Sequence, residues 1–204
     1  MKATKIVITG GPCAGKSSAL SHIKSLAEAH GYTVLTVAET ATELIGGGVA
    51  PWTCKTNADY QACQMRLQIE KERVFLQAAA GMRAEKILIV CDRGLMDNRA
   101  YMTEEDFARV SRELSLTRED CLSAYDAVFH LCTAAKGAEA FYTTANNASR
   151  TETPAEARAV DDALIAAWEG HPYHRMIGNS GSFADKMAAL GAALEEFFER
   201  GEGA

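Results

Sequence analysis

The stretch "ITGGPCAGKSSAL" (residues 8–20) decides the fold class of this chain. It contains the complete Walker A pattern, Gly-x-x-x-x-Gly-Lys-Ser, over residues 10–17. The pattern lies between a β-branched run at residues 5–9, typical of a buried strand, and a segment with helical periodicity at residues 16–29. A strand, a glycine-rich turn and a helix in this order are the context that the pattern requires.

This turn predicts a phosphate-binding loop. Glycine-rich geometry lets successive backbone N–H groups point at one place, and the following helix aims its positive end at the same place. Lys16 supplies a charge for the β- and γ-phosphates, and the Ser17 hydroxyl supplies a ligand for Mg²⁺. The sequence therefore predicts ATP or GTP, with Mg²⁺, bound by Gly10, Gly11, Pro12, Cys13, Ala14, Gly15, Lys16, Ser17 and Ser18.

Strands and helices alternate along the rest of the chain. Apolar runs predict strands at residues 33–37, 86–91, 127–131 and, weakly, 175–177. Helical patterns fall at residues 40–45, 58–82, 104–114, 118–124 and 161–169, and a capping box at 182–185 opens a last helix. On that helix Phe183, Met187, Leu190, Leu194 and Phe197 share one face, which favours core packing.

This alternation predicts an α/β fold: a P-loop NTPase three-layer sandwich with a five-stranded parallel sheet. We expect one domain over residues 1–204, with a helical or loop lid. The segment 134–160 is the candidate for the lid because its polar composition predicts mobility and because it contains Lys136, Arg150 and Arg158. These cations could close over the phosphates, although a solvated loop with ordinary surface charges is an equal alternative.

Asp92 and Arg93 follow the apolar run "ILIVC" (residues 87–91). Asp92 stands where a strand-end acid would help Ser17 to hold the metal. Motor-type ATPases commonly follow this acid with a glutamate, whereas an arginine suits transfer between donor and acceptor oxygens. The alternative is that Asp92 caps a turn and Arg93 pairs on the surface.

Glu39 closes the second strand, at the edge where a ligand crevice is expected. It could accept a proton or a hydrogen bond from an acceptor hydroxyl, or it could simply stabilise the start of the next helix. Gln61, Gln64 and Gln68 share one helix face. They could recognise a nucleobase, but a solvated face is the more common reason for such a row.

The amino-acid composition limits the classes of partner that we expect for this protein. The chain has 204 residues, a net charge of -6 and a pI near 5.4, which argues against non-specific nucleic-acid binding. Six cysteines without a C-x-x-C pair fit a reducing compartment. Without a signal peptide or an 18-residue apolar stretch, we expect a cytoplasmic protein without a transmembrane segment. Trp52 and Trp168 are expected to be packing residues.

Several blocks together resemble a known family: "KIVITGGPCAGKSS", "AETATELIGGG", "DRGLMDNRAYM" and "WEGHPYHRMIGN". They look like the small P-loop proteins with an ATPase-domain label, which include proteins like the TRPL translocation defect protein and are similar to the kinase part of NadR. The resemblance implies a nucleoside- or nucleotide-kinase fold that binds ATP or GTP. It also implies that Glu39 is the acceptor-side base, that Asp92 and Arg93 form the acid–arginine pair, and that Arg150 and Arg158 belong to the lid.

Three functions remain open on this basis. The first is an ATP-dependent kinase that transfers the γ-phosphoryl group to a small hydroxylated, nucleoside-like acceptor. In that case Lys16, Glu39, Asp92, Arg93, Arg150 and Arg158 form the catalytic set. The second is a nucleotide-dependent switch that binds a protein or phosphoinositide partner. The third is a simple NTPase.

Overall fold

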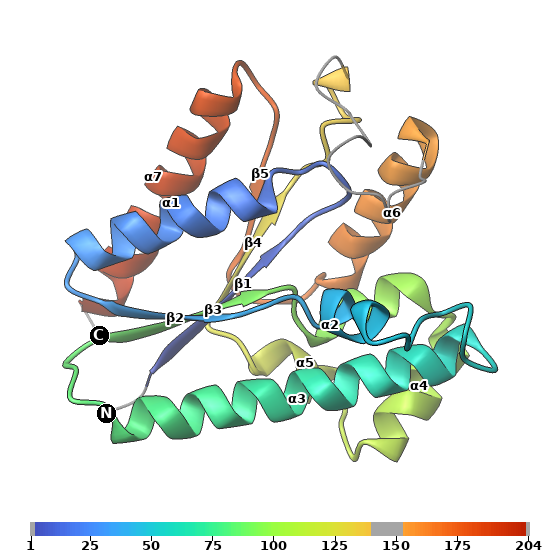
Figure 1. The fold of residues 1–204 in the computed structure, drawn as a ribbon. Helices are drawn as coiled ribbons and strands as arrows, with labels where there is room; N and C mark the ends of the chain where they lie inside the picture. Colours follow the sequence, from blue (N-terminus) through green and yellow to red (C-terminus); the bar gives the residue numbers. More distant parts are fainter. Residues whose placement is uncertain (1–2, 140–152, 203–204) are drawn as a thin grey trace.

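The computed structural model describes residues 3–139 and 153–202 of the chain (Figure 1). Its five strands form one parallel sheet in the order β2-β3-β1-β4-β5. The five-stranded parallel sheet predicted from the apolar runs is confirmed. The strands are β1 (Thr4–Thr9), β2 (Thr33–Val37), β3 (Ile87–Asp92), β4 (Ala127–Leu131) and β5 (His174–Ile177).

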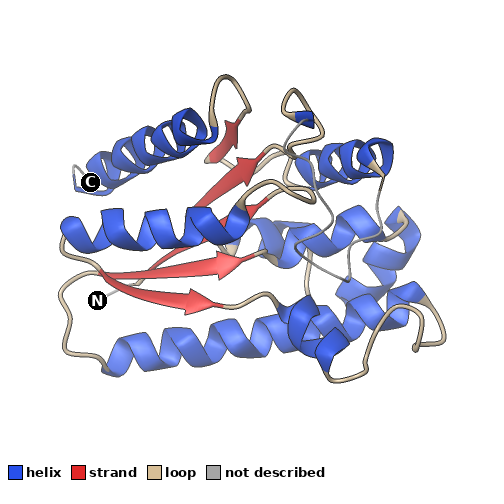
Figure 2. Cartoon of the chain, turned by 45° about the horizontal axis from the view of Figure 1, so that its top comes forward, coloured by secondary structure: helices blue, strands red, loops and turns tan. Residues whose placement is uncertain are grey.

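The central strands are apolar on both sides because helices cover both faces of the sheet (Figure 2). Along β1, Ile6 and Ile8 pack into one core cluster and Val7 into the other. The first cluster is covered by α1 (Lys16–Ala29) and α7 (Phe183–Glu202). The second cluster is covered mainly by α3 (Asn57–Gly81), η1 (Leu95–Tyr101), α4 (Glu104–Glu113) and α5 (Arg118–Ser123).

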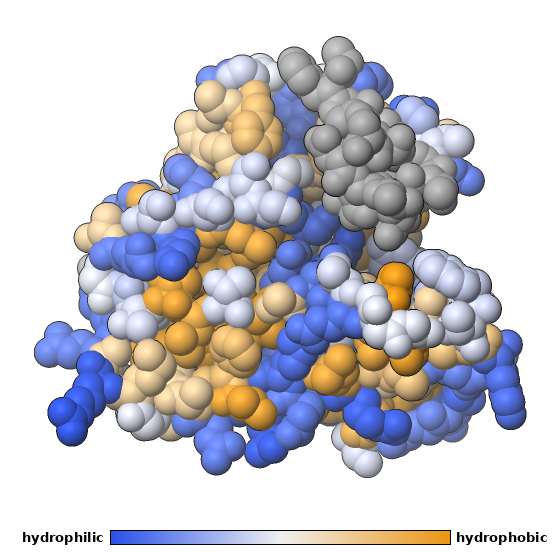
Figure 3. Space-filling view, in the orientation of Figure 1, coloured by the Kyte–Doolittle hydropathy of each residue, from blue (hydrophilic) through white to orange (hydrophobic). Residues whose placement is uncertain are grey.

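Two further helices border the carboxyl edge of the sheet. The short helix α2 (Thr40–Gly46) follows β2 and packs on α3, and α6 (Pro154–Ala167) packs on η1. None of the helices in the described ranges is long and apolar enough to cross a bilayer. Figure 3 shows apolar side chains gathered between α1 and α3 on the face where the edge strand β2 runs.

The helix α6 corrects the predicted lid segment. It begins at Pro154, seven residues before the predicted start, so the last part of 134–160 is ordered helix. The Thr153 side chain accepts from the Glu156 N–H while the Glu156 carboxylate accepts from the Thr153 N–H, and Pro154 suits the first helical position. Residues 134–137 form a turn after β4. Residues 140–152, which include Arg150, lie outside the described residues.

Two packing predictions are wrong, those for Trp52 and Phe183, and the solvated-face alternative for the α3 glutamines does not hold. Trp168 is fully buried as expected, but Trp52 is 74% exposed. Phe183 is 52% exposed because it is the first residue of α7 and lies at the phosphate loop instead of in the core. The glutamine row on α3 is not a solvated face, since Gln61, Gln64 and Gln68 are all buried.

Candidate functional site

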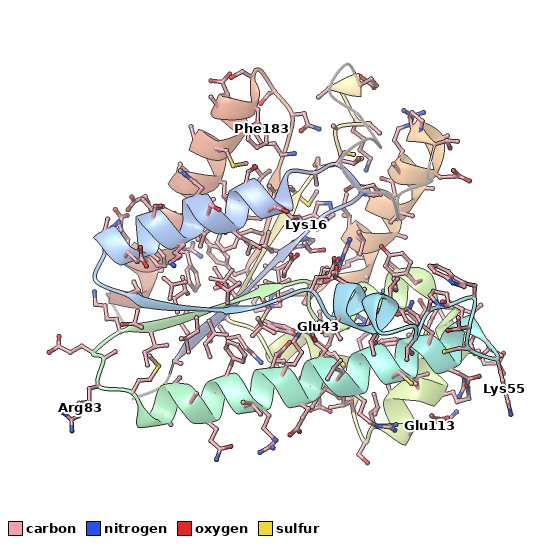
Figure 4. All side chains as sticks on the ribbon, viewed as in Figure 1. Lys16, Glu43, Lys55, Arg83, Glu113 and Phe183 are labelled. Atoms are coloured by element: carbon pink, nitrogen blue, oxygen red, sulfur yellow. The ribbon has the colours of Figure 1, made fainter. Side chains whose placement is uncertain are left out.

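The predicted phosphate loop occupies the turn between β1 and α1. Gly10 and Gly15 have positive φ angles, and a Cβ at Gly10 would lie 2.1 Å from the carbonyl oxygen of Leu131. Only glycine fits there. Figure 4 shows Lys16 at the start of α1, and its Nζ donates to the carbonyl oxygens of Gly10 (3.0 Å) and Gly11 (3.3 Å). The loop thus has the shape and the cation of a phosphate cradle.

Asp92 ends β3 beside this loop, paired in register with Ile8 of β1. Its Oδ1 is buried and has no hydrogen-bond partner among the described residues. Burial raises the pKa of Asp92, and the nearby Glu39 carboxylate raises it further. A carboxylate oxygen without a partner among the described residues fits the oxygen ligands that Mg²⁺ prefers, and the exposed Ser17 offers a hydroxyl oxygen.

Arg93 connects the loop to the end of β2. Its Nε donates to Glu39 Oε1 at 2.7 Å, and its Nη1 lies 3.5 Å from both Gly10 O and Asp97 Oδ1. The φ angle of Arg93 is 71°, a left-handed conformation that disfavours a side chain. Non-glycine residues held in such conformations cluster at functional sites. The Arg93 side chain is also only 14% exposed, so the surface-pair alternative does not fit this geometry.

Asp97 orients this arginine, and sequence reasoning missed it. The side chain is buried, accepts from the Gly94 N–H at 2.7 Å and also accepts from the Thr9 hydroxyl. The spacing Arg93-x-x-x-Asp97 was the available signal. Burial would lower the pKa of Arg93, but the acidic groups around it outweigh burial and raise it, so the guanidinium remains charged.

Glu39 occupies the N-cap position of α2 without capping it through its side chain. Its carboxylate instead accepts from Arg93 and from the Thr42 hydroxyl at 2.7 Å. Burial would raise the pKa of Glu39, but the Arg93 guanidinium, with smaller contributions from the Thr42 hydroxyl and Lys16, outweighs burial and lowers the pKa to about 2. Glu39 is therefore ionised at neutral pH, and of its two predicted roles the geometry favours the one at the crevice.

A cavity of about 500 Å³ opens beside this pair, and we name it the α2–α3 pocket. Tyr60 and Gln61 are buried in its wall, yet Tyr60 Oη and Gln61 Oε1 have no hydrogen-bond partner among the described residues. Burial and the Glu39 charge raise the pKa of Tyr60 to about 12, so its hydroxyl stays a neutral donor. The lining residues are Glu39, Ala41, Thr42, Ile45, Gly46, Pro51, Trp52, Asn57, Tyr60, Gln61, Gln64, Arg93 and Tyr101.

A second cavity of about 200 Å³, the α7 pocket, lies on the other side of the phosphate loop. Phe183 forms one wall, and a Cβ at Gly15 would lie 2.7 Å from its ring. Lys186 donates to Cys132 O (2.6 Å) and Asn179 Oδ1 (2.8 Å). The other lining residues are Cys13, Ala14, Ala134, Ala138, Asn179, Gly181 and Ser182.

Two of the predicted lid cations, Lys136 and Arg158, lie in the described part of the chain, and both contact residues behind the phosphate loop or in the turn after β4. Lys136 forms ion pairs with Asp161 (2.7 Å) and Asp162 (2.6 Å). Arg158 is exposed on α6 and donates to Ala135 O at 3.0 Å. The structure thus brings together Lys16, Glu39, Asp92 and Arg93 at the carboxyl edge of the sheet, with Ser17 next to Lys16 in α1, and it binds Arg158 to the turn after β4.

A protein-family model described as an AAA domain matches residues 5–186. The chain belongs to this AAA domain family. No curated protein matches the sequence of this AAA domain. Among solved structures it is similar to a deoxyadenosine kinase from M. mycoides with bound dATP, with a TM-score of 0.58 and 13% identity. The match covers 94% of this chain and 99% of the kinase. At this identity the likeness shows the fold, and the P-loop family implies nucleotide binding.

Proposed function

We propose that this protein is an ATP-dependent kinase that phosphorylates a hydroxyl group of a nucleoside-like acceptor. The observation that carries the proposal is the α2–α3 pocket, in which Tyr60 Oη and Gln61 Oε1 are buried beside the Glu39–Arg93 pair and find no partner within residues 3–139 and 153–202. Buried polar atoms without partners are costly unless a ligand satisfies them. Transfer to water would not need such a pocket.

On the donor side, the phosphate loop holds the triphosphate and Lys16 neutralises the β- and γ-phosphates. Ser17 and Asp92 Oδ1, which has no hydrogen-bond partner among the described residues, would hold Mg²⁺, and the ion would supply charge stabilisation for the transferred group. The α7 pocket takes the nucleobase, because Phe183 offers an aromatic face directly beside the loop. ATP and GTP remain alternatives for the donor.

On the acceptor side, Glu39 accepts a hydrogen bond from the reacting hydroxyl. The acceptor oxygen bonds to the γ-phosphorus, the bond to the β–γ bridging oxygen breaks, ADP leaves, and the hydroxyl proton passes to solvent. Arg93 lies 2.7 Å from Glu39 and 3.5 Å from the loop carbonyl of Gly10, so it can bridge donor and acceptor oxygens as charge shifts. Arg158 and Arg150 remain candidates for lid residues.

Two similarities to known kinases support a nucleoside-like acceptor. The fold is that of a deoxyadenosine kinase, and several sequence blocks resemble NadR-like kinases. A nucleoside also suits the lining of the α2–α3 pocket, which combines the aromatic Trp52 and Tyr101 with the amides of Gln61 and Gln64.

The test is a turnover screen with MgATP and a panel of nucleosides and deoxynucleosides, followed by mass spectrometry of the products. We expect at least one acceptor to raise ADP release about tenfold or more and to yield a monophosphate. Glu39→Gln should lower that turnover about 100-fold. Glu43→Gln is the matched control, because Glu43 lies on the same helix but pairs with Lys71 at the surface. ADP release that no acceptor changes would contradict the proposal and favour an NTPase or a switch.

A further inference from the structure

A buried carboxylate lies directly behind the phosphate loop and has no part in the proposed chemistry. It belongs to Asp161 on α6, whose side chain is completely buried. Asp161 Oδ1 accepts from the Gly11 N–H at 2.9 Å and from the Thr133 N–H at 3.2 Å. The same oxygen lies 3.0 Å from His130 Nε2, and Oδ2 lies 2.7 Å from Lys136 Nζ.

These contacts join four parts of the chain: the phosphate loop, β4, the turn after β4, and α6. Burying a carboxylate is costly unless charged and hydrogen-bonding partners compensate for the lost water. Burial alone would raise the pKa of Asp161, but the bonds from His130 and Lys136 hold it far below its ordinary value. Asp161 is thus an ionised group that depends on these partners.

The contact with the loop leaves no free space. A Cβ at Gly11 would lie 2.9 Å from Asp161 Oδ1 and 3.0 Å from Asp161 Cβ. Thr133 adds a second restraint, because its hydroxyl donates to Pro12 O at 2.5 Å. The first bend of the loop is therefore held from behind, while the N–H groups expected to face the phosphates come later in the loop.

A metal site is the competing interpretation, since ligand atoms of His130, Cys132 and Asp161 lie within 4.8 Å of one another. However, the His130 Nε2 and Asp161 Oδ1 atoms already bond to each other, and Oδ1 also accepts from two backbone N–H groups. An ion bound through Oδ1 would have to displace these bonds, and an ion bound through Oδ2 would have to displace the Lys136 ammonium group, which lies 2.7 Å away. A hydrogen-bonded cluster is the better interpretation.

We infer that Asp161 is a positioning residue for nucleotide binding: it fixes the first bend of the phosphate loop and ties that bend to α6. The inference rests on nucleotide binding at the loop and not on the identity of the acceptor. It implies that a change on α6, away from the phosphates, alters affinity for the triphosphate.

The test is calorimetric titration of MgATP into the full chain. Asp161→Asn should weaken binding about tenfold or more, because an amide cannot satisfy the cation and both backbone donors equally. Asp162→Asn is the matched control: it is the next residue, it pairs with the same Lys136, and its side chain is 70% exposed. It should change the Kd less than twofold. Rescue by Asp161→Glu is not expected, because the buried site has no room for a longer side chain.

A double-mutant cycle separates positioning from general destabilisation. Gly11→Ala disturbs the same contact from the loop side, so its effect on the Kd and that of Asp161→Asn should be clearly non-additive. If Asp161→Asn does not fold, Lys136→Met tests the same cluster from its exposed side and should weaken binding at least threefold. Binding within twofold of the wild type in whichever variant folds, or strict additivity, would overturn the inference. A wild type that binds MgATP but phosphorylates nothing would contradict only the kinase proposal.

Discussion

At the scale of single residues, Arg93 has a left-handed backbone conformation (φ 71°), and its side chain forms ion pairs with Glu39 and Asp97. This conformation costs about 1–2 kcal/mol for a residue with a Cβ, whereas glycine adopts it freely. Arg93→Ala loses the ion pairs and keeps the strain, while Arg93→Gly loses both. Glycine relieves the strain but loses more backbone entropy on folding than alanine does, which offsets part of this gain. The net result is that Arg93→Gly should be more stable than Arg93→Ala by about 0.5–1 kcal/mol.

Urea denaturation of the two variants measures this difference. The matched control is Arg112, which lies on α4 and is exposed, where Arg112→Gly should be less stable than Arg112→Ala. The opposite order at position 93 would show that the left-handed backbone is not a strained feature.

Glu39 predicts a specific dependence of stability on pH. Its pKa is about 2 in the folded protein against an ordinary value of 4.5. Because the folded pKa is the lower one, the stabilisation is fully present above about pH 4.5 and is lost as the pH falls towards 2. Between pH 6 and pH 3 the wild type should therefore lose about 2 kcal/mol more than Glu39→Gln. Equal losses in denaturation at the two pH values would contradict the pairing with Arg93.

At the scale of elements, α3 carries a chain of buried hydrogen bonds that connects residues of the site to one another. Gln68 accepts from the Thr40 hydroxyl and donates to Arg93 O (3.3 Å) and Glu72 Oε1 (2.7 Å). Glu72 in turn accepts from Lys5 Nζ at 2.6 Å. Helix α3 thereby joins the start of α2 and the backbone of Arg93 to β1.

Breaking the Lys5–Glu72 pair should be more harmful than neutralising it. Lys5→Met leaves a buried carboxylate without its cation and should cost about 3–5 kcal/mol. Adding Glu72→Gln removes the stranded charge while keeping an oxygen for Gln68, so the double variant should regain part of that loss. Thermal and chemical denaturation of both variants measure the recovery. The exposed pair Lys24–Glu28 is the control and should show losses below about 1 kcal/mol. A double variant less stable than Lys5→Met would contradict the charge argument.

The elements show which features the sequence could predict. The apolar runs determined all five strands, and α3 was predicted to within one residue at each end, because both patterns depend on local periodicity. The start of α6 was missed although Thr153, Pro154 and Glu156 carry its capping signals. The Arg93–Glu39 contact joins residues 54 positions apart, and the Gly11–Asp161 contact joins residues 150 apart. No local sequence pattern predicts contacts between residues so far apart in the chain. From the sequence alone, Asp161 cannot be distinguished from any other polar residue of a helix.

At the scale of the whole molecule, the phosphate loop separates two cavities that are proposed to hold different ligands. The α7 pocket is lined by Cys13 and Ala14 of the loop, and the α2–α3 pocket contains the Glu39–Arg93 pair. Donor and acceptor would then approach the transferred group from opposite sides, which is the in-line arrangement that phosphoryl transfer requires.

The two tryptophans allow this division to be tested. Trp52 is 74% exposed and lines the α2–α3 pocket, whereas Trp168 is fully buried. Acrylamide should therefore quench mainly Trp52. A bound nucleoside, with deoxyadenosine as the first probe, should reduce the quenching constant about twofold or more because a pocket of this kind buries most of its ligand's surface. MgADP alone should leave it unchanged, and Trp52→Phe should remove the response to the nucleoside. Equal shielding of Trp52 by MgADP would place the nucleotide in the α2–α3 pocket and reverse the assignment, since Trp52 lines that pocket and is not among the residues that line the α7 pocket.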